Sequence, residues 1–221
     1  ALGEPNKAYQ FSLGSDIIFV PNEMALNFQE HITISFWIKL DAVTQESFIV
    51  SHGSWEERWK VSVTPDKKLR WTIKTSSGTK DLDSSFPLAL DHFYHFTAVY
   101  SGYSLELYAD GELDTFLPDS GLISQTTKAI TFGRKDATIT NYHLQGTLDE
   151  VRIYDHALEP DEIITLKSLW NAVTSIPHET TNQLSIYPNP AKGAINIESD
   201  MPIENPELRD VTGRQLNISV T

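Results

Sequence analysis

The stretch ITISFWIKL (residues 32–40) alternates strictly between apolar and other side chains. Ile32, Ile34, Phe36, Ile38 and Leu40 occupy every second position, and the positions between them hold Thr33, Ser35, Trp37 and Lys39. Because successive side chains of a strand point to opposite faces of its sheet, this order places the apolar set on one face. The stretch therefore predicts a half-buried strand of an antiparallel sheet.

Shorter runs of the same kind recur through about the first 160 residues, with turn residues between them. They are residues 47–52, 58–64, 68–75, 93–101, 104–110, 129–133 and 146–155. Asp110-Gly111 is typical of a type I′ hairpin turn, whose two central residues both need a positive φ. Strands at this spacing, without amphipathic helices between them, predict an all-β fold: an antiparallel two-sheet β-sandwich of the jelly-roll type. We expect the run 146–155 to form its final edge.

Residues 157–171 break the strand pattern and predict one short helix after the last long strand. Pro160 suits the first turn of a helix, and Asp161 and Glu162 suit its positive N-terminal end. We expect the buried stripe of this helix to consist of Leu158, Ile163, Leu166 and Trp170.

The composition changes after the helix, where residues 172–183 are rich in Thr, Ser, Pro and Asn, as linkers are. The sequence thus predicts a jelly-roll domain over residues 1–171, a linker over residues 172–183 and a small β appendage over residues 184–221.

The charge of the chain excludes one class of partner. Lys and Arg number 17 against 30 Asp and Glu, a net charge of −13, and no local basic stripe offsets it, so we expect no nucleic acid partner. The absence of cysteine excludes disulfides and a cysteine nucleophile. No apolar run approaches the roughly 20 residues of a membrane span. The N-terminus lacks a signal-peptide pattern, so we expect that an export signal was removed or lies upstream.

The most specific motif of the chain is GTLDEVRIYDHALEPDEIITL (146–166), supported by AYQFSLGSDIIFVPN (8–22) and SLELYADGEL (104–113). With these stretches the sequence resembles the laminin G-like branch of the concanavalin A-like lectin/glucanase superfamily, over about residues 3–170. The resemblance implies a structural calcium ion bound by Asp149, with Asp16 as a second ligand and the backbone at His52-Gly53 as a weaker one. Oxygen ligands from separate loops suit calcium. The alternative is that Asp149 caps a turn or pairs with Arg152.

A second resemblance begins at LSIYPNPAKGAINIES (184–199) and continues through residues 207–216. This segment is similar to the C-terminal sorting domain of the type IX secretion system. The resemblance implies a secreted or cell-surface protein whose partner is the secretion machinery. Because the family pattern usually continues for several more strands, we expect this appendage to be truncated.

The sequence offers little support for catalysis. A glycosidase needs two carboxylates flanking the bond it cleaves, and the ExDxxE arrangement that the superfamily's glucanases carry on one strand is missing. Asp149 and Glu150 are neighbours, so in a strand they point to opposite faces. The seven histidines are scattered, and no GxSxG nucleophile motif occurs. We therefore predict a non-catalytic chain and leave open whether a longer parent protein carries a catalytic module.

Trp55 is the most informative candidate for ligand binding, because SHGSWEERW (51–59) is polar and turn-like and offers its ring little core to join. Exposed aromatic rings stack on sugars, and nearby charged groups supply hydrogen bonds. The candidate ligand-binding residues are Trp55, Glu56, Glu57 and Arg58, with Tyr103 and Tyr142 as loop partners. The alternative is that Trp55 only covers a loop.

These observations favour a secreted, non-catalytic binding module that recognises a polysaccharide or other glycan as part of a larger protein. Two alternatives remain open. One is an adhesin or structural spacer with protein partners, and the other is a polysaccharide-degrading enzyme of the same superfamily. The first reading rests mainly on the resemblance, because a fold does not define a function.

Overall fold

The computed structural model describes residues 8–12, 14–136, 138–139 and 141–172, and four short strands beyond residue 183. The chain divides into two compact units, Ala1–Ser175 and Ile176–Thr221. In the second unit, β13 (Leu184–Tyr187) pairs with β14 (Asn196–Ser199), and β15 (Leu208–Arg209) pairs with β16 (Gln215–Leu216). Apart from Ala172, the predicted linker lies outside the described residues.

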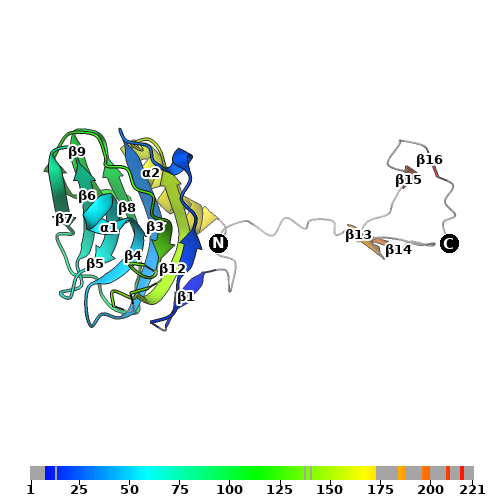
Figure 1. Ribbon diagram of the computed structural model, residues 1–221. Coiled ribbons are helices and arrows are strands. Elements are labelled where there is room, and N and C mark those ends of the chain that lie inside the picture. The colour runs from blue at the N-terminus through cyan, green and yellow to red at the C-terminus, as the bar shows by residue number, and fades with distance from the viewer. Residues whose placement is uncertain are drawn as a thin grey trace. The chain divides into compact units, whose positions relative to one another are not determined.

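The first unit consists of two six-stranded sheets, which Figure 1 shows face to face. The first sheet has the order β1 (Tyr9–Phe11), β12 (Gln145–Tyr154), β3 (Ile32–Ala42), β8 (Phe93–Tyr100), β9 (Ser104–Ala109) and β10 (Glu112–Pro118). The second has the order β2 (Ile18–Val20), β11 (Ile130–Phe132), β4 (Ser47–His52), β5 (Trp59–Val63), β6 (Leu69–Thr75) and β7 (Gly78–Asp83). The pairs are antiparallel, so the predicted all-β sandwich is confirmed.

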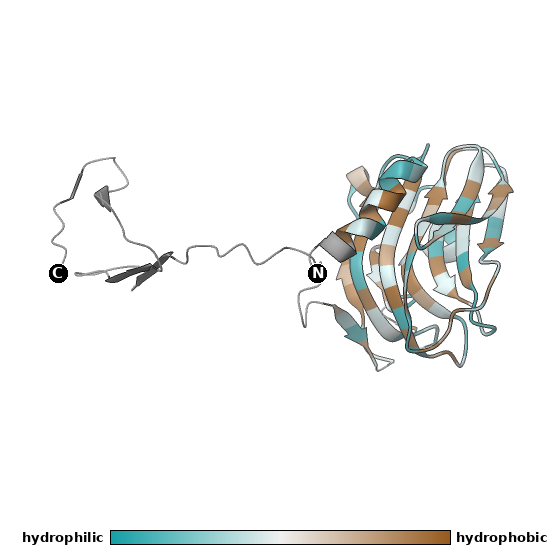
Figure 2. Cartoon of the chain, turned by 180° about the vertical axis from the view of Figure 1, so that it is seen from behind, coloured by the Kyte–Doolittle hydropathy of each residue, from teal (hydrophilic) through white to brown (hydrophobic). Residues whose placement is uncertain are grey.

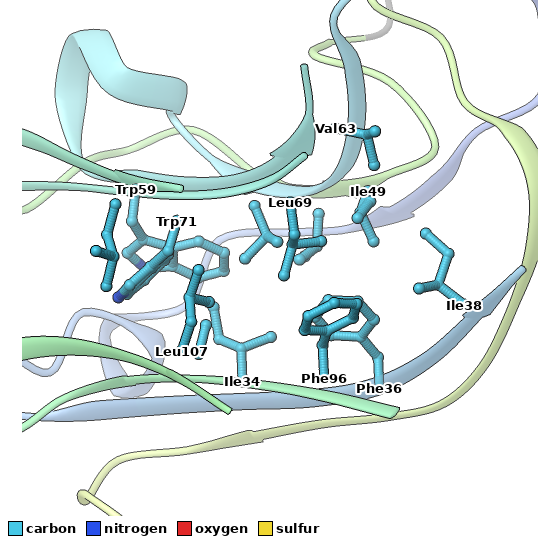
Figure 3. Close-up of a cluster of buried hydrophobic side chains, with 14 of the residues drawn as sticks. Ile34, Phe36, Ile38, Ile49, Trp59, Val63, Leu69, Trp71, Phe96 and Leu107 are labelled. Carbon is cyan, nitrogen blue, oxygen red and sulfur yellow. The ribbon is translucent and has the colours of Figure 1, made fainter. Parts of the chain in front are cut away.

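The core lies between the two sheets and is built from alternate residues of their strands, an alternation visible in the colouring of Figure 2. In Figure 3, Ile34, Phe36 and Ile38 of β3 face Trp59 and Trp71 of the other sheet across this core. Trp71 is fully buried, and its indole nitrogen donates a hydrogen bond to the carbonyl oxygen of Val99 at 3.2 Å. The core therefore ties the two sheets together by apolar packing.

The prediction that residues 146–155 form the final edge of a sheet is wrong. β12 lies between β3 and the three-residue strand β1, whose Phe11 pairs with Gly146. The β12–β3 register shifts between Asp149 and Arg152, where Glu150 has a φ of 50°. A strand as short as β1 shows too little alternation to be recognised in the sequence, so β12 was mistaken for the edge.

Helix α2 (Pro160–Ala172) packs on the outer face of the first sheet. Leu158 and Ile163 contact Val99 and Tyr108 there, while the backbone N–H of Leu158 donates to the hydroxyl of Thr33 at 3.0 Å. Leu158, Ile163 and Leu166 thus form the predicted stripe, whereas the Trp170 side chain lies outside the described residues. Two shorter helical turns, η1 (Met24–Leu26) and α1 (Ser54–Glu57), lie in loops. In the described part of the chain, no helix is both long and apolar enough to cross a membrane.

Candidate ligand-binding surface

Alternate residues of β5, β6 and β7 are polar and point away from the core on the outer side of the second sheet. Those of β5 and the central part of β6 are buried, whereas those nearest the edge strand β7 are partly exposed. The cross-strand register places Lys60 opposite Thr72 and Ser62 opposite Arg70. On the next strand, Asp81 lies opposite Thr72 and Asp83 lies opposite Arg70. The residues between them, such as Val61 and Trp71, belong to the core. We call the set Lys60, Ser62, Arg70, Thr72, Asp81 and Asp83 the polar face. Its side chains share one side of the sheet because successive residues of a strand point to opposite faces.

The charges of the polar face are paired. The Lys60 ammonium lies 2.5 Å from a carboxylate oxygen of Glu46, which also accepts a hydrogen bond from Ser62 at 2.7 Å. Burial lowers the pKa of Lys60, and the Glu46 carboxylate opposes that shift. Arg70 donates two hydrogen bonds to Asp83, at 2.6 and 2.7 Å, which raise the pKa of Arg70. These pairs hold the polar side chains in fixed positions before any ligand arrives.

Trp55 lies beside the polar face in an aromatic cluster with Phe48 and Tyr142. Its ring centroid is 5.9 Å from that of Phe48 and 6.1 Å from that of Tyr142, both in edge-on geometry. The Lys135 ammonium lies 4.1 Å from the Trp55 ring centroid and 3.0 Å from a carboxylate oxygen of Glu56. Trp55 is therefore half-buried, and the Lys135 cation covers part of its ring.

The backbone that presents Trp55 depends on Gly53. Gly53 has a φ of 72°, and a Cβ atom there would lie 2.9 Å from the Cβ of Glu57 and from the Thr126 hydroxyl. The backbone N–H of the next residue, Ser54, donates a hydrogen bond to the side-chain oxygen of Ser51 at 3.0 Å. A side chain at position 53 would disturb α1, and with it the position of Trp55.

The side chains of Glu57 and Arg58 point into the protein and away from the outer surface on which Trp55 lies. Glu57 accepts a hydrogen bond from the Thr126 hydroxyl. Arg58 is fully buried, and its guanidinium donates to the carbonyl oxygens of Leu26 at 2.7 Å, Ser124 at 3.0 Å and Phe28, and to His52 Nδ1 at 2.6 Å. Burial lowers the pKa of Arg58 to about 10. Arg58 therefore joins three loop segments inside the protein and is not part of a surface that a ligand reaches.

The two tyrosines predicted as loop partners lie in different places. The carbonyl oxygen of Tyr142 accepts a hydrogen bond from the backbone N–H of Phe48 at 2.9 Å, which fixes Tyr142 beside β4 and Trp55. Tyr103 lies in the β8–β9 turn of the other sheet and is 81% exposed. In the described part of the chain its ring contacts neither Trp55 nor Tyr142.

The two predicted calcium ligands lie near the edge formed by β1 and β2. Asp149 is buried and accepts a hydrogen bond from the Glu150 N–H at 2.9 Å, and Asp16 accepts one from the Ser12 N–H at 2.8 Å. Each carboxylate lines a depression, and the two depressions share Tyr9 and Ile18. Among the described residues, no group of three or more His or acidic side chains is placed to bind a metal. Calcium at Asp149 and Asp16 stays a prediction, in which backbone carbonyls and water complete the shell.

One serine–histidine pair invites a catalytic interpretation, which its burial opposes. The hydroxyl of Ser35 and Nε2 of His95 are 2.9 Å apart on the outer face of the first sheet, where His95 also packs against Trp37. Ser35 is fully buried and His95 is 1% exposed. Burial lowers the pKa of His95 to about 4. A substrate cannot reach this pair without displacing the packing around it.

The comparison with protein families agrees with this architecture. Residues 13–164 match the model of the concanavalin A-like lectin/glucanases superfamily. The chain belongs to this superfamily. Residues 185–221 match the model of a secretion system C-terminal sorting domain, which marks a secreted or cell-surface protein. Among curated proteins, none matches the chain.

Solved structures of other proteins share the fold at low identity. Domain 4 of AbnA, an extracellular arabinanase from Geobacillus stearothermophilus crystallised with arabinotriose, has a TM-score of 0.60 and 19% identity, over 76% of this chain and 79% of that one. The binding domain of Paraclostridial Mosquitocidal Protein 1 has a TM-score of 0.59 and 22% identity, over 71% of this chain and 42% of that one. A pentraxin from Limulus polyphemus has a TM-score of 0.51 and 18% identity, over 69% and 81%.

The residues around Trp55 that the sequence prediction missed are those of the polar face and Lys135. Asp83 lies in β7, which the sequence did not predict. Lys60 and Arg70 lie in predicted strands, and their alternation with apolar residues was a usable signal. Lys135 gave none, because it lies in a loop and reaches Trp55 only through the folding of the chain.

Proposed function

We propose that this chain is a secreted, non-catalytic module that binds a carbohydrate on the polar face beside Trp55 and Tyr142. The observation that supports the proposal best is the combination of fixed, paired polar groups with a half-exposed aromatic cluster on one sheet surface. Hydroxyl groups of a sugar find donors and acceptors in Arg70, Asp81 and Asp83, while the apolar face of a sugar ring packs on the aromatic rings. The similar domain crystallised with arabinotriose supports the same ligand class.

Binding at this site requires that Lys135 move or share the surface of Trp55. The ammonium of Lys135 covers part of the indole, and its partner Glu56 has a side chain that is 55% exposed. The Lys135 side chain is 10% exposed, so a sugar ring that displaces it must compensate for the lost contact between this cation and the Trp55 ring. The aromatic surface is then available for stacking.

A glycan array with the full chain and its Trp55→Ala variant tests the proposal. Phe116→Ala is the matched control, because Phe116 is also an exposed aromatic residue but lies on β10 of the other sheet. We expect the wild type and Phe116→Ala to retain the same glycan, and Trp55→Ala to bind it at least about tenfold more weakly, the loss of one aromatic contact. Equal binding by all three proteins would show that Trp55 is not part of the glycan-binding site.

The non-catalytic part of the proposal rests on the arrangement of possible catalytic groups. The Ser35–His95 pair is buried, and Asp149 and Glu150 occupy adjacent positions of β12. Incubation of the purified chain with a panel of polysaccharides, followed by reducing-end detection, should show no release above the buffer control. Release that persists in the His95→Gln variant would point to an enzyme with a different site.

A second candidate function has its own observation. Leu113 and Phe116 are 53% and 62% exposed on the edge strand β10, and Ile164 of α2 is 51% exposed. Exposed apolar residues of this kind favour a protein partner, as expected of an adhesin or spacer. Cross-linking of the full chain and its Leu113→Asp variant to surface proteins of the producing cells distinguishes this function, because only protein binding should depend on Leu113.

A further inference from the structure

The end of the sandwich carries a cleft that is separate from the polar face. It has a volume of about 380 Å³ and is lined by the segment from Asn27 to His31, by Leu122 and by Asp155. These residues precede β3, follow β10 and follow β12, so segments distant in the sequence meet there. We call it the end cleft.

Tyr103 lies in a turn that packs against two residues lining the end cleft. Its neighbour Gly102 has a φ of 84°, and a Cβ atom on Gly102 would lie 3.4 Å from the carbonyl oxygen of Glu30 and 3.6 Å from Nε2 of His31. The β8–β9 turn therefore packs directly against the segment that lines the cleft. This packing places an aromatic side chain, 81% exposed, next to an opening that has polar walls.

The walls of the end cleft are held in place by side chains that are already hydrogen-bonded. The side-chain oxygen of Asn27 accepts a hydrogen bond from the Thr126 N–H at 3.0 Å, and the Gln29 amide donates to the carbonyl oxygen of Ile123 at 3.2 Å. The backbone N–H of Ile123 in turn donates to the carbonyl oxygen of Gln29 at 2.8 Å. A preformed wall loses little conformational entropy when a ligand binds.

Other polar groups around the end cleft remain available. Within the described residues, the side chains of Glu30, His31 and Tyr103 form no hydrogen bond or ion pair. Asp155, in contrast, lies 3.0 Å from Nδ1 of His156. The exposed Leu122 adds an apolar surface between these groups. Hydrogen-bonding groups around an apolar patch and an aromatic ring suit a polyhydroxylated ligand with C–H faces.

The charge of the lining selects among such ligands. No Lys or Arg is among the described residues that line the end cleft, and Glu30 and Asp155 make it acidic. An acidic sugar would leave its carboxylate near Glu30 without a cationic partner, which is unfavourable. A neutral sugar meets no such repulsion.

We propose that the end cleft is a second carbohydrate site, which takes a neutral oligosaccharide between Tyr103, His31 and Leu122. The inference shares the ligand class of the proposed function and adds a site on a different surface. Two sites on one small domain increase the avidity for a polysaccharide that presents many copies of its repeat.

Titration of the ¹⁵N-labelled full chain, followed by NMR, tests the proposal. The probes are three neutral trisaccharides (arabinotriose, cellotriose and maltotriose), a trimer of galacturonate and a trimer of glucosamine, each to about 10 mM, which detects Kd values in the millimolar range. We expect at least one neutral probe to shift the amide signals of Glu30, His31 and Tyr103, while the galacturonate trimer leaves them unchanged.

Variants separate the end cleft from the polar face. Tyr103→Ala and His31→Ala should each weaken binding at the end cleft about tenfold, as expected for one aromatic contact or one hydrogen bond. Trp55→Ala should leave that binding unchanged. His31 is partly exposed and Tyr103 is largely exposed, so neither substitution should disturb the core. An unchanged amide spectrum elsewhere verifies that each variant is folded.

Each other outcome has a definite meaning. Neutral sugars that bind only through Trp55 would overturn the second site and leave the proposed function standing. Binding that depends on Tyr103 but not on Trp55 would support the end cleft and refute the polar face. Binding of the glucosamine trimer alone, with loss at high salt, would overturn the choice of a neutral ligand. Absence of binding by every probe would overturn both sites.

Discussion

The outer faces of the two sheets share the same alternating sequence pattern but differ in how far their side chains are exposed. On the first sheet, Thr33, Ser35 and Trp37 alternate with core residues of β3, and all three are buried, Trp37 at 8% exposure. On the second sheet, Ser62 and Thr72 alternate with core residues in the same way and are buried too. Arg70 and Asp83, at the edge strand β7 or next to it, stay partly exposed. The first face is overlaid by α2 and its flanking residues, whereas the second carries ion pairs. A period of two thus identifies an outward face without deciding whether it is covered.

Among the variants that test this contrast, removal of the Ile163 side chain, which packs α2 onto the first sheet, should have the largest effect on the free energy of unfolding. Ile163→Ala deletes a fully buried side chain that packs on Val99 and Tyr108, and we expect it to lower the free energy of unfolding by about 2–5 kcal/mol. The neighbouring Ile164 is 51% exposed, so Ile164→Ala should change it by less than about 0.5 kcal/mol. Urea denaturation of both variants measures the difference. Equal effects would mean that α2 does not seal the first face.

Acid should weaken both sheets through two buried histidines. Burial lowers the pKa of His95, on the first sheet, and of His52, on the second, to about 4 each. The Arg58 cation contributes to the shift of His52. Between the unfolded pKa of about 6.5 and the folded pKa of about 4, the unfolded chain binds more protons, so stability falls as the pH decreases through this window.

We expect each of these histidines to remove roughly 2 kcal/mol of stability between pH 7 and pH 4.5. Urea denaturation at a series of pH values measures this slope. In the His95→Gln variant the slope should fall to about half, whatever the absolute stability of the variant. A slope that His95→Gln leaves unchanged would show that His95 titrates normally.

The ion pairs of the two sheets should differ in strength by a smaller amount. The Lys60 side chain is 4% exposed in its pair with Glu46, whereas Lys39 of β3 is 27% exposed in its pair with Asp41. Lys60→Met leaves the Glu46 carboxylate without its cation, and we expect a loss of about 1–2 kcal/mol. Lys39→Met should cost less than about 0.5 kcal/mol, as an exposed pair does. Thermal denaturation of the two variants ranks them directly.

Calcium should change stability about as much as the buried ion pair does. If Asp149 and Asp16 hold the ion at the β1–β2 edge, a calcium concentration ten times the dissociation constant adds about 1.4 kcal/mol to the free energy of unfolding. The midpoint of thermal unfolding should therefore rise with calcium relative to EDTA in the wild type and not in Asp149→Asn. Magnesium is the control ion, because it prefers a smaller octahedral shell. No difference between calcium and EDTA would contradict the site.

Much of the architecture could be predicted because its signals are local. The runs 47–52 and 104–110 became β4 and β9 with little change, and Asp110 and Gly111 have the positive φ values, 50° and 87°, that their turn requires. The strands that escaped prediction were β1, β2, β7 and β10. Two of them have only three residues, and β7 (GTKDLD) has a single buried side chain, Leu82, so neither length nor alternation identifies them.

The candidate site was predictable only in part. Trp55, Glu56 and Tyr142 do meet, through contacts of Trp55 with Tyr142 and of Glu56 with Lys135. Arg58 was indistinguishable in the sequence from a surface arginine, because its burial depends on carbonyl oxygens of Leu26, Phe28 and Ser124 that reach it from other loops. Tyr103 was grouped with Trp55 because both lie in polar turns, and turns carry no information about which end of a sandwich they occupy.

By itself, the sequence determined that the chain makes amphipathic strands, that those strands form a sandwich, and that one short helix follows them. These are properties of side-chain period and turn chemistry, which act over a few neighbouring residues. Only the tertiary structure decided that α2 covers one outer face, that β1 lies outside β12, and that the turn at Gly102 packs against Glu30 and His31 at the end cleft. Each of these depends on contacts between distant segments, whose free energies come from packing and burial that no local pattern encodes.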